Sequence, residues 1–270
     1  MRNLSLKVFY MKALWKGAIS FGLVNIPVKL YSGAVTHRID LDMIRKKDQC
    51  RIEYVRVCKK DGKEVAWDEI AKGYKKEDGD YVILDKEDLA SAMPEKTQTI
   101  DIFEFVLEDE IPSQYLEKPY IIEPEKAATK TYALLHAALK KSGKVGLCKF
   151  ILRQSEHLGI LKVEQEAILL IQIRFNQDLR DPNEVKLPTG IKIEKKELDM
   201  AMTIIDQLTE KFEPEKYKDT YKDELLKLIK KKSALPKGKK LVDKESKPKP
   251  SKASDDLLEQ LRASLEALKN

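Results

Sequence analysis

Cys148, together with His136 or His157, is the pairing that could provide a thiol nucleophile with a neighbouring base. Covalent catalysis by cysteine needs the thiolate, which forms readily only near a positive charge or a helix N-terminus. Residues 147–152 are apolar and strand-like, and apolar surroundings raise the pKa of a thiol. We therefore expect Cys148 to be a small core residue and not a nucleophile.

His37, Cys50 and Cys58 are close enough along the chain to suggest a zinc site. Structural zinc sites have four ligands, commonly with CxxC spacing, and here both that spacing and a nearby fourth ligand are lacking. We expect Cys50 and Cys58, like Cys148, to be buried as small hydrophobic side chains. Three cysteines without framework spacing argue against a disulfide scaffold and suit a reducing compartment.

Asp181 followed by Glu194, Lys195 and Lys196 has the residue types of a metal-dependent nuclease. Carboxylates would hold Mg²⁺, and a lysine would stabilise the charge that develops on the phosphate. The chain holds 45 acidic residues, so such groupings arise by coincidence on a solvated surface. A DNA nuclease that uses Asp181, Glu194 and Lys196 is kept as an alternative function.

The stretch WKGAISFGLVNIPVKLY, residues 15–31, places two glycines as a phosphate-binding loop would. Such a loop has Lys and then Ser or Thr directly after the second glycine, whereas Leu23 and Val24 stand there. Alternating apolar residues indicate a strand instead. The alternation that runs through Ile19, Phe21 and Leu23 changes parity at Val24, which predicts a bulge or a sharp bend near Val24 and Asn25. No cofactor is expected.

Positive charge is concentrated in two parts of the chain. Among 270 residues, 36% are charged, 42% are hydrophobic and the net charge is +6. Lys227 to Lys252 holds eleven lysines against two acids, a local +9, so the remainder sums to −3. Arg45 to Lys76 holds eleven basic residues against six acids, a local +5, with Tyr54, Trp67 and Tyr74 interleaved. Such clusters suit phosphates, which give affinity without sequence readout.

Short runs rich in β-branched and aromatic residues, separated by turn signals, predict an antiparallel barrel or sandwich. These runs cover residues 52–57, 81–84, 100–107, 120–122, 147–152, 158–163 and 168–175. One helix is expected among them, over residues 127–141, with Tyr132, Leu135 and Leu139 on one face and Gly143 beyond its end.

The last third of the chain has helical periodicity. Apolar residues predict helices over residues 197–208 and 217–229. Residues 233–252 are rich in Lys, Pro and Ser, and predict a flexible linker. A short amphipathic helix, capped by Ser254, is expected within residues 253–270.

No membrane segment is expected. The longest apolar run, Ala167 to Ile171, is far shorter than the roughly 18 residues that a membrane span needs. Lys7 and Lys12 interrupt the apolar stretches at the N-terminus, so no signal peptide forms. We expect a cytoplasmic, nucleoid-associated protein. Residues 1–10, which precede Met11, are expected to be an upstream extension or tag without a role in the fold.

Three stretches resemble, in order, successive signature blocks of the bacterial Ku proteins. They are WKGAISFGLVNIPVKLY, CRIEYVRVCKKDGKEVAWDEIAKGYKKEDGDYVIL and EKFEPEKYKDTYKDELLKLIKKK. The resemblance implies an α+β fold, a Ku-type β-barrel core with a helical C-terminal arm, in an intertwined homodimer that forms a ring. It also implies sequence-independent binding of double-stranded DNA ends, which protects or bridges breaks in non-homologous end joining. Recruitment of the multifunctional ATP-dependent DNA ligase D and the lack of enzymatic activity are implied as well.

The resemblance also implies a division of the chain and a set of site residues. The division is an extension over 1–10, a barrel core with a DNA-encircling bridge over 11–190, a helical arm over 191–232, a linker over 233–252 and a short helix over 253–270. Candidate DNA contacts in the bridge are Arg45, Lys46, Lys47, Arg51, Arg56, Lys59, Lys60, Lys63, Lys72 and Lys75. Weaker DNA candidates are Lys149 and Arg153. The tail after Lys232 varies among family members, and its lysines here, among them Lys237, Lys239 and Lys240, suggest an extra, unspecific DNA contact. Candidate partner contacts are Tyr217, Tyr221, Leu225, Leu258, Leu261 and Leu265.

The rival hypotheses are the metal-dependent nuclease and a general nucleic-acid-coating protein that works through its lysine-rich tail. Neither rival requires the three blocks to occur in this order, which favours the end-binding hypothesis. Strand alternation implies that about half of the bridge candidates point away from DNA. The sequence does not indicate which half.

Overall fold

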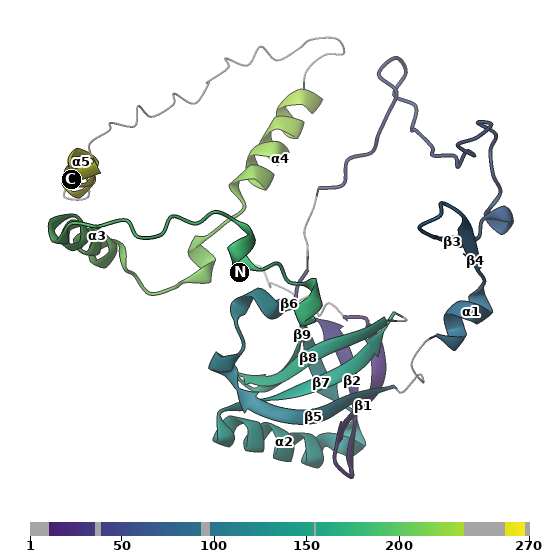
Figure 1. Ribbon diagram of the computed structural model, residues 1–270, viewed down its shortest axis with the longest axis horizontal. Helices are drawn as coiled ribbons and strands as arrows, with labels where there is room; N and C mark the ends of the chain where they lie inside the picture. The colour runs from purple at the N-terminus through teal and green to yellow at the C-terminus, as the bar shows by residue number, and fades with distance from the viewer. Residues whose placement is uncertain (1–10, 36–38, 93–97, 154, 235–256, 268–270) are drawn as a thin grey trace, which may run out of the picture. The chain divides into compact units, whose positions relative to one another are not determined.

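The computed structural model describes residues 11–35, 39–92, 98–153, 155–234 and 257–267 (Figure 1). The chain separates into two units, which are described individually. One contains the described residues up to Pro182 apart from Ile39 and Asp40, and the other contains those two and the described residues from Asn183 onward.

The first unit is built around a closed barrel of seven strands in the order β1-β2-β6-β9-β8-β7-β5. Neighbouring strands are antiparallel except β1 and β5, whose parallel pairing closes the barrel. Closure leaves no unpaired edge, and the barrel predicted from the strand runs is confirmed. The strands are β1 (Trp15–Phe21), β2 (Val24–Ser32), β5 (Thr99–Leu107), β6 (Leu116–Pro124), β7 (Lys144–Leu152), β8 (Ser155–Glu164) and β9 (Ala167–Ile173).

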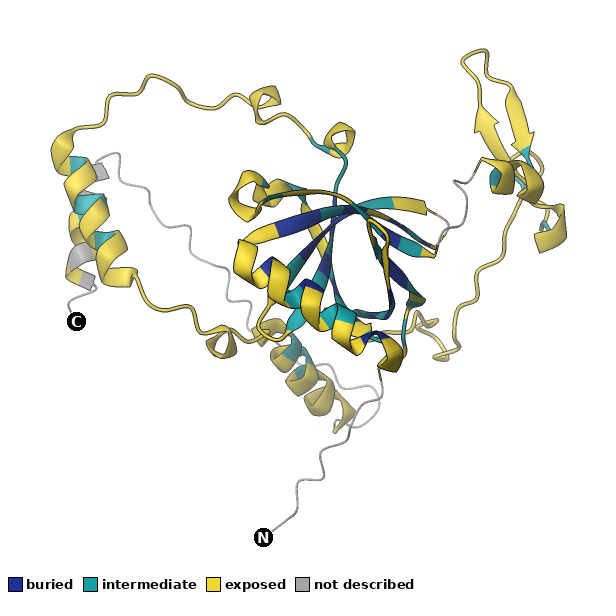
Figure 2. Ribbon diagram, turned by 90° about the horizontal axis from the view of Figure 1, so that it is seen from below, coloured by how far each residue is buried: buried dark blue, intermediate teal, exposed yellow. Residues whose placement is uncertain are grey.

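The core fills the barrel because alternate side chains of each strand point inward. In β2, Ile26, Val28 and Leu30 are buried, and in β9 Ile168 and Leu170 are buried. Figure 2 shows that the buried, dark blue parts of the ribbon lie on the barrel strands and on the helix beside them. Among the described residues, the largest fully buried side chain is Phe150 of β7.

Helix α2 (Thr129–Ser142) packs on this barrel, as predicted (Figure 1). Leu135 and Leu139 are buried against the core. The helix ends at Gly143, whose φ of +65° gives the left-handed cap that glycine adopts without strain. Tyr132 anchors the helix, since its hydroxyl donates to the Ile122 carbonyl at 3.2 Å and accepts from the Ile168 N–H at 2.9 Å.

The sequence predicted a bulge or a sharp bend near Val24 and Asn25, and the structure has a sharp bend directly before Val24 and no bulge. Residues 15–32 form a hairpin whose turn is at Gly22, with φ +59°, and Leu23. Residues directly opposite in an antiparallel pair share a face, and Phe21 pairs with Val24. The two-residue turn therefore produces the change of parity without a bulge.

An insertion, residues 41–92, lies between β2 and β5 in the chain. It contains the antiparallel pair β3 (Lys72–Lys75) and β4 (Tyr81–Leu84) and the helix α1 (Lys86–Ser91). The strand predicted over residues 52–57 is wrong: only isolated pairs, Ile44 with Arg51 and Val57 with Glu64, form there. Its β-branched residues have no continuous neighbouring strand to pair with. No residue of the insertion is buried (Figure 2).

The second unit is helical, with α3 (Lys195–Leu208), α4 (Thr220–Ser233) and α5 (Leu257–Ala267). The predicted helices are confirmed, except that Tyr217 lies ahead of α4, which Asp219 caps by accepting the Lys222 N–H at 3.0 Å. Helix α5 packs beside α3 (Figures 1 and 2). Ser254 lies outside the described residues. None of the described helices is long and apolar enough to span a membrane.

Short 3-10 helices complete the described secondary structure. They are η1 (Trp67–Glu69), η2 (Glu108–Glu110), η3 (Ser113–Tyr115), η4 (Lys126–Ala128), η5 (Asn176–Asp178), η6 (Pro182–Glu184) and η7 (Pro214–Lys216).

Candidate nucleic-acid interface

The three arginine candidates of the insertion all have partners within it. Arg45 forms a bidentate pair with Asp48, at 3.0 and 2.5 Å. Arg51 pairs with Asp42 at 2.8 Å. The Arg45 guanidinium holds the pKa of the Asp48 carboxyl below its usual range, helped by the Cys50 N–H. These pairs hold the two arginine side chains at the first turn of the insertion, and both side chains stay exposed, at 61% and 78%.

The third arginine, Arg56, stacks on an aromatic ring. Its guanidinium lies 3.7 Å from the centroid of the Trp67 ring. The Val65 N–H also donates to the Arg56 carbonyl at 2.9 Å. Arg56 therefore joins two stretches of a segment that has no buried core.

The lysine candidates of the insertion differ from the arginines. All are exposed, and none of their ammonium groups has a hydrogen bond or an ion pair with a residue that the structure describes. Their charge is therefore available to a polyanion. They are Lys46, Lys47, Lys59, Lys60, Lys63, Lys72 and Lys75.

The candidates outside the insertion fall into different environments. Lys149 pairs with Glu156 on the adjacent strand at 3.3 Å. Arg153 adopts φ +53° where β7 ends. The tail candidates Lys237, Lys239 and Lys240 lie outside the described residues.

The partner-binding candidates lie on or beside the helices of the second unit. Tyr217 stacks on Phe212 with ring centroids 5.9 Å apart. Tyr221 is exposed and Leu225 is half-buried, both on α4. The remaining three, Leu258, Leu261 and Leu265, lie on α5.

The cysteine predictions are confirmed for one residue and wrong for another. Cys148 is fully buried, and burial, followed by the charge of Asp101, raises the pKa of its thiol. Cys50 is exposed and Cys58 is half-buried, because the insertion has no interior in which to bury them. His37 lies outside the described residues.

The nuclease alternative requires acidic side chains grouped around a metal ion. Within the part of the chain that the structure describes, no three His, Cys, Asp or Glu side chains are grouped so that they could hold a metal ion. Glu194 stands at the start of α3, where its N–H donates to the Glu197 carboxylate at 2.9 Å. Glu194 is therefore accounted for as the residue that caps the N-terminus of α3.

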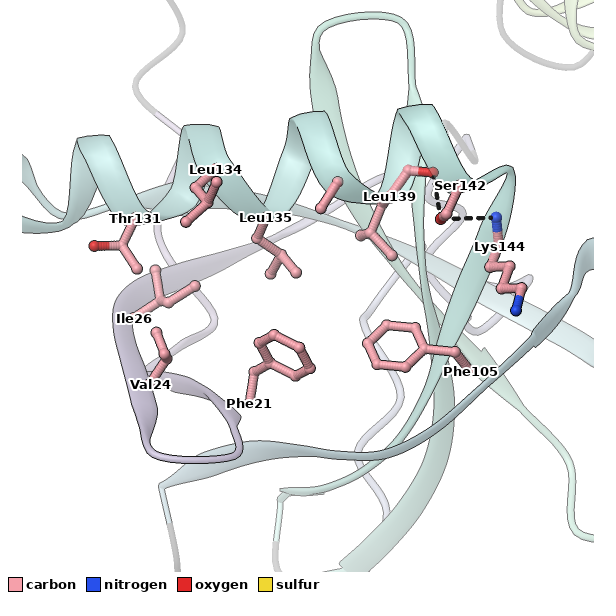
Figure 3. Close-up of a pocket in the computed structure, with 11 residues that line it drawn as sticks. Phe21, Val24, Ile26, Phe105, Thr131, Leu134, Leu135, Leu139, Ser142 and Lys144 are labelled. Carbon is pink, nitrogen blue, oxygen red and sulfur yellow. Dashed lines mark hydrogen bonds between the residues drawn. The ribbon is translucent and has the colours of Figure 1, made fainter.

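The barrel unit carries an apolar cavity of about 350 Å³ between α2 and the ends of β1, β2 and β5. Figure 3 shows Phe21 and Phe105 facing Leu135 and Leu139 across it. The two rings meet edge to face at 5.5 Å. Among the described residues that line the cavity, Lys144 alone is ionisable, so the cavity suits an apolar group and offers no acid–base pair.

Comparison with known proteins identifies the family. The family model described as the Ku70/Ku80 beta-barrel domain matches residues 20–200. The chain belongs to the Ku family. The Ku match runs from the end of β1 through the rest of the barrel and the insertion to the start of α3. Together with the relatives described next, it confirms the resemblance to the Ku family.

Relatives within the Ku family match nearly the whole chain. The non-homologous end joining protein Ku of Opitutus terrae is 39% identical, over 94% of this chain and 91% of the relative. The proteins of the same name from Pseudomonas aeruginosa and Bacillus subtilis are each 38% identical, over 94% and 95% of this chain and 88% and 82% of the relatives. Among solved structures, the SPOC domain of human PHD-finger protein 3 aligns at 13% identity with a TM-score of 0.30, which carries no weight.

Two features of the Ku insertion were missed in the sequence. Arg45 and Asp48 are three residues apart, so their pairing could have been inferred from spacing. The contact of Arg56 with Trp67 depends on an intervening turn, which local spacing does not reveal.

Proposed function

We propose that this chain binds the ends of double-stranded DNA without reading sequence and acts in non-homologous end joining. The observation that carries the proposal is the set of seven lysines in the insertion of a Ku-family chain, whose ammonium groups face solvent. Lysine contacts to phosphates supply affinity and position but no base readout. The relatives are named for non-homologous end joining, which supports the same role here.

The proposal includes a homodimeric ring that encircles the duplex. The insertion exposes large apolar side chains, among them Leu41 at 69%, Tyr54 at 75% and Ile83 at 68%. Exposed apolar surface of this kind marks a protein–protein interface. A second copy offers the same surface, and a symmetric pair would cover both. Light scattering is expected to give twice the 31.0 kDa chain mass; a stable monomer would contradict the ring.

The proposal also includes recruitment of the ATP-dependent DNA ligase D and no catalytic activity of the chain itself. Tyr217 and Tyr221 are 72% and 75% exposed, and aromatic side chains are enriched in interfaces. Alanine at both positions is expected to weaken capture of ligase D on DNA without changing binding of the DNA alone. Equal capture by wild type and variant would remove these residues from the partner surface.

End binding is tested by comparing linear and closed circular DNA of one sequence, with competitor DNA present and at several salt concentrations. Strong preference for the linear form is expected. Equal affinity for circles would indicate a coating protein, and Mg²⁺-dependent shortening of the linear DNA that Glu194→Ala abolishes would indicate the nuclease. Deleting residues 233–270 is expected to lower the salt dependence, by roughly 0.9 in the log–log slope for each phosphate that the tail no longer neutralises.

A further inference from the structure

Two turns of the insertion are built in the same way. The first, residues 45–50, reads RKKDQC, and the second, residues 58–63, reads CKKDGK. In each, the N–H of the first residue donates to the carbonyl of the sixth, at 2.8 and 2.7 Å, and the N–H of the fifth donates to the carbonyl of the first, at 2.8 Å in both. We name them the KKD turns.

The KKD turns also share their backbone conformation and their aspartate contact. The fifth residue adopts positive φ in both, +60° at Gln49 and +70° at Gly62. The Oδ1 atoms of Asp48 and Asp61 accept the N–H of the sixth residue of their turn, at 3.2 Å in each. Aspartate contacts of this kind fix a turn locally. The two turns are therefore equivalent in geometry and not only in sequence.

Each KKD turn is closed at its base by an antiparallel pair. Ile44 pairs with Arg51 around the first turn, and Val57 pairs with Glu64 around the second. The second and third residues of each turn, both lysines, therefore lie in the loop that the base pair closes off. All four lysines are exposed, and their ammonium groups have no partner among the described residues.

The aspartate of each turn does not neutralise these lysines. Asp48 is held by Arg45 and by the Cys50 N–H, and Asp61 is held by the Lys63 N–H. The turns thus combine a fixed backbone with two lysines, at their second and third positions, that have no partner among the described residues, and the second turn carries a further such lysine, Lys63, at its sixth position. Charges displayed on a preformed turn lose less freedom on binding than charges on a mobile chain.

We propose that the two KKD turns are a matched pair of phosphate-binding turns, each of which presents two lysines to the backbone of duplex DNA: Lys46 with Lys47, and Lys59 with Lys60. This proposal rests on the proposed DNA binding and deepens it, since it separates four lysines from the other basic residues of the insertion. Arg45, Arg51 and Arg56 then serve to hold the turns and the segment between them. Because the two turns share one backbone geometry, the two lysine pairs are expected to contribute equally to binding.

The salt dependence of binding to a linear duplex tests the inference. Each phosphate contact contributes about 0.9 to the slope of log affinity against log salt. The variants K46Q/K47Q and K59Q/K60Q are each expected to lower the slope by about 1.8 per copy of the chain in the complex, and the fourfold variant by about 3.6. K126Q/K130Q, which changes two exposed lysines in η4 and α2, is the matched control and is expected to leave the slope unchanged.

The aspartate has a positioning role that a second pair of variants isolates. Asp61→Ala and Asp61→Asn remove the same charge, but asparagine keeps an oxygen that can accept the Lys63 N–H. The alanine variant is therefore expected to have a smaller salt slope than the asparagine variant. Equal slopes in these two variants would remove Asp61 from the account of the second turn.

The outcomes for the inference and for the proposed function are distinct. Suppose that wild-type protein binds linear DNA. The KKD turns are then not the phosphate contacts if either lysine double variant keeps the wild-type salt slope, or if the control variant lowers the salt slope as much as the lysine double variants do. If wild-type protein fails to bind linear DNA, the proposed function itself is overturned. Circular dichroism and thermal unfolding identify any variant whose loss comes from misfolding.

Discussion

The Arg56 guanidinium lies 3.7 Å from the centroid of the Trp67 ring, and this contact links the chain that precedes the second KKD turn to the chain that follows it. Trp67 is 72% exposed, so the contact is made at the surface. A cation–π contact at an exposed site contributes about 0.5–1 kcal/mol. It organises a segment that burial does not stabilise.

Replacing Trp67 with alanine is expected to loosen this segment locally. The Val65 N–H donates to the Arg56 carbonyl, so its hydrogen exchange reports on the contact. A loss of about 0.5–1 kcal/mol corresponds to a roughly two- to fivefold drop in protection of the Val65 amide. Exchange of barrel amides such as Ile168 serves as the control. Unchanged protection at Val65 would mean that the ring contact contributes nothing to local order.

Tyr132 and Tyr31 allow a matched test of how α2 is attached to the barrel. Tyr132→Phe removes the hydroxyl that accepts from the Ile168 N–H and donates to the Ile122 carbonyl. Leaving partly buried backbone groups without partners is expected to lower the free energy of unfolding by about 1–3 kcal/mol. Tyr31→Phe removes an exposed contact to Glu123 and is expected to be near neutral. Urea unfolding of both variants gives the comparison, and equal stabilities would contradict the anchoring role.

Cys148 makes stability depend on pH in the alkaline range. Burial raises the pKa of its thiol in the folded state, whereas an unfolded thiol titrates near 8.5. Above that pH the unfolded chain loses a proton that the folded chain retains, so stability that is present below pH 8.5 is lost as the pH rises. Between pH 8 and pH 10 the loss is about 2 kcal/mol. Cys148→Ala is expected to show a flatter pH profile, measured by urea unfolding; parallel profiles would contradict the argument.

The exposed Cys50 and the buried Cys148 are expected to differ in thiol reactivity. A small aromatic disulfide reagent should modify Cys50 in the folded protein and should reach Cys148 only on unfolding. Cys58 is half-buried, so the control is Cys50→Ala/Cys58→Ala, which is expected to show no reaction in the folded protein. Rapid modification of Cys148 in the native protein would show that the barrel opens far more readily than its packing implies.

Much of the barrel is predictable from the sequence because its strands alternate inward and outward residues. Ile168 and Leu170 in β9 show the rule, since every second side chain is buried. The same rule failed over residues 52–57, where the β-branched residues are suitable but no neighbouring strand is present. It could not distinguish a bulge from a sharp bend near Val24, because a two-residue hairpin turn and a bulge both change parity.

The candidate DNA contacts were only partly predictable. The sequence locates the basic segment, yet charge alone does not distinguish Arg51, which pairs with Asp42, from Lys59, which has no partner among the described residues. Which basic residues are paired depends on the three-dimensional geometry of the turns, and charge and spacing along the chain do not give that geometry. The repeated KKD string was visible in the sequence, and its meaning became clear only when both copies showed the same hydrogen bonds.

The most direct test of the central claim, a ring that loads at DNA ends, is an order-of-addition experiment. A linear duplex biotinylated at both ends is capped with streptavidin either before or after the protein is added, and the complexes are then washed at high salt. The account predicts no retained protein when the caps come first, and protein that survives the wash when the caps come second, because a closed ring cannot leave a capped duplex. Equal retention of protein in the two orders would contradict the ring. So would complete loss of protein in both orders, provided that the protein binds uncapped DNA at low salt.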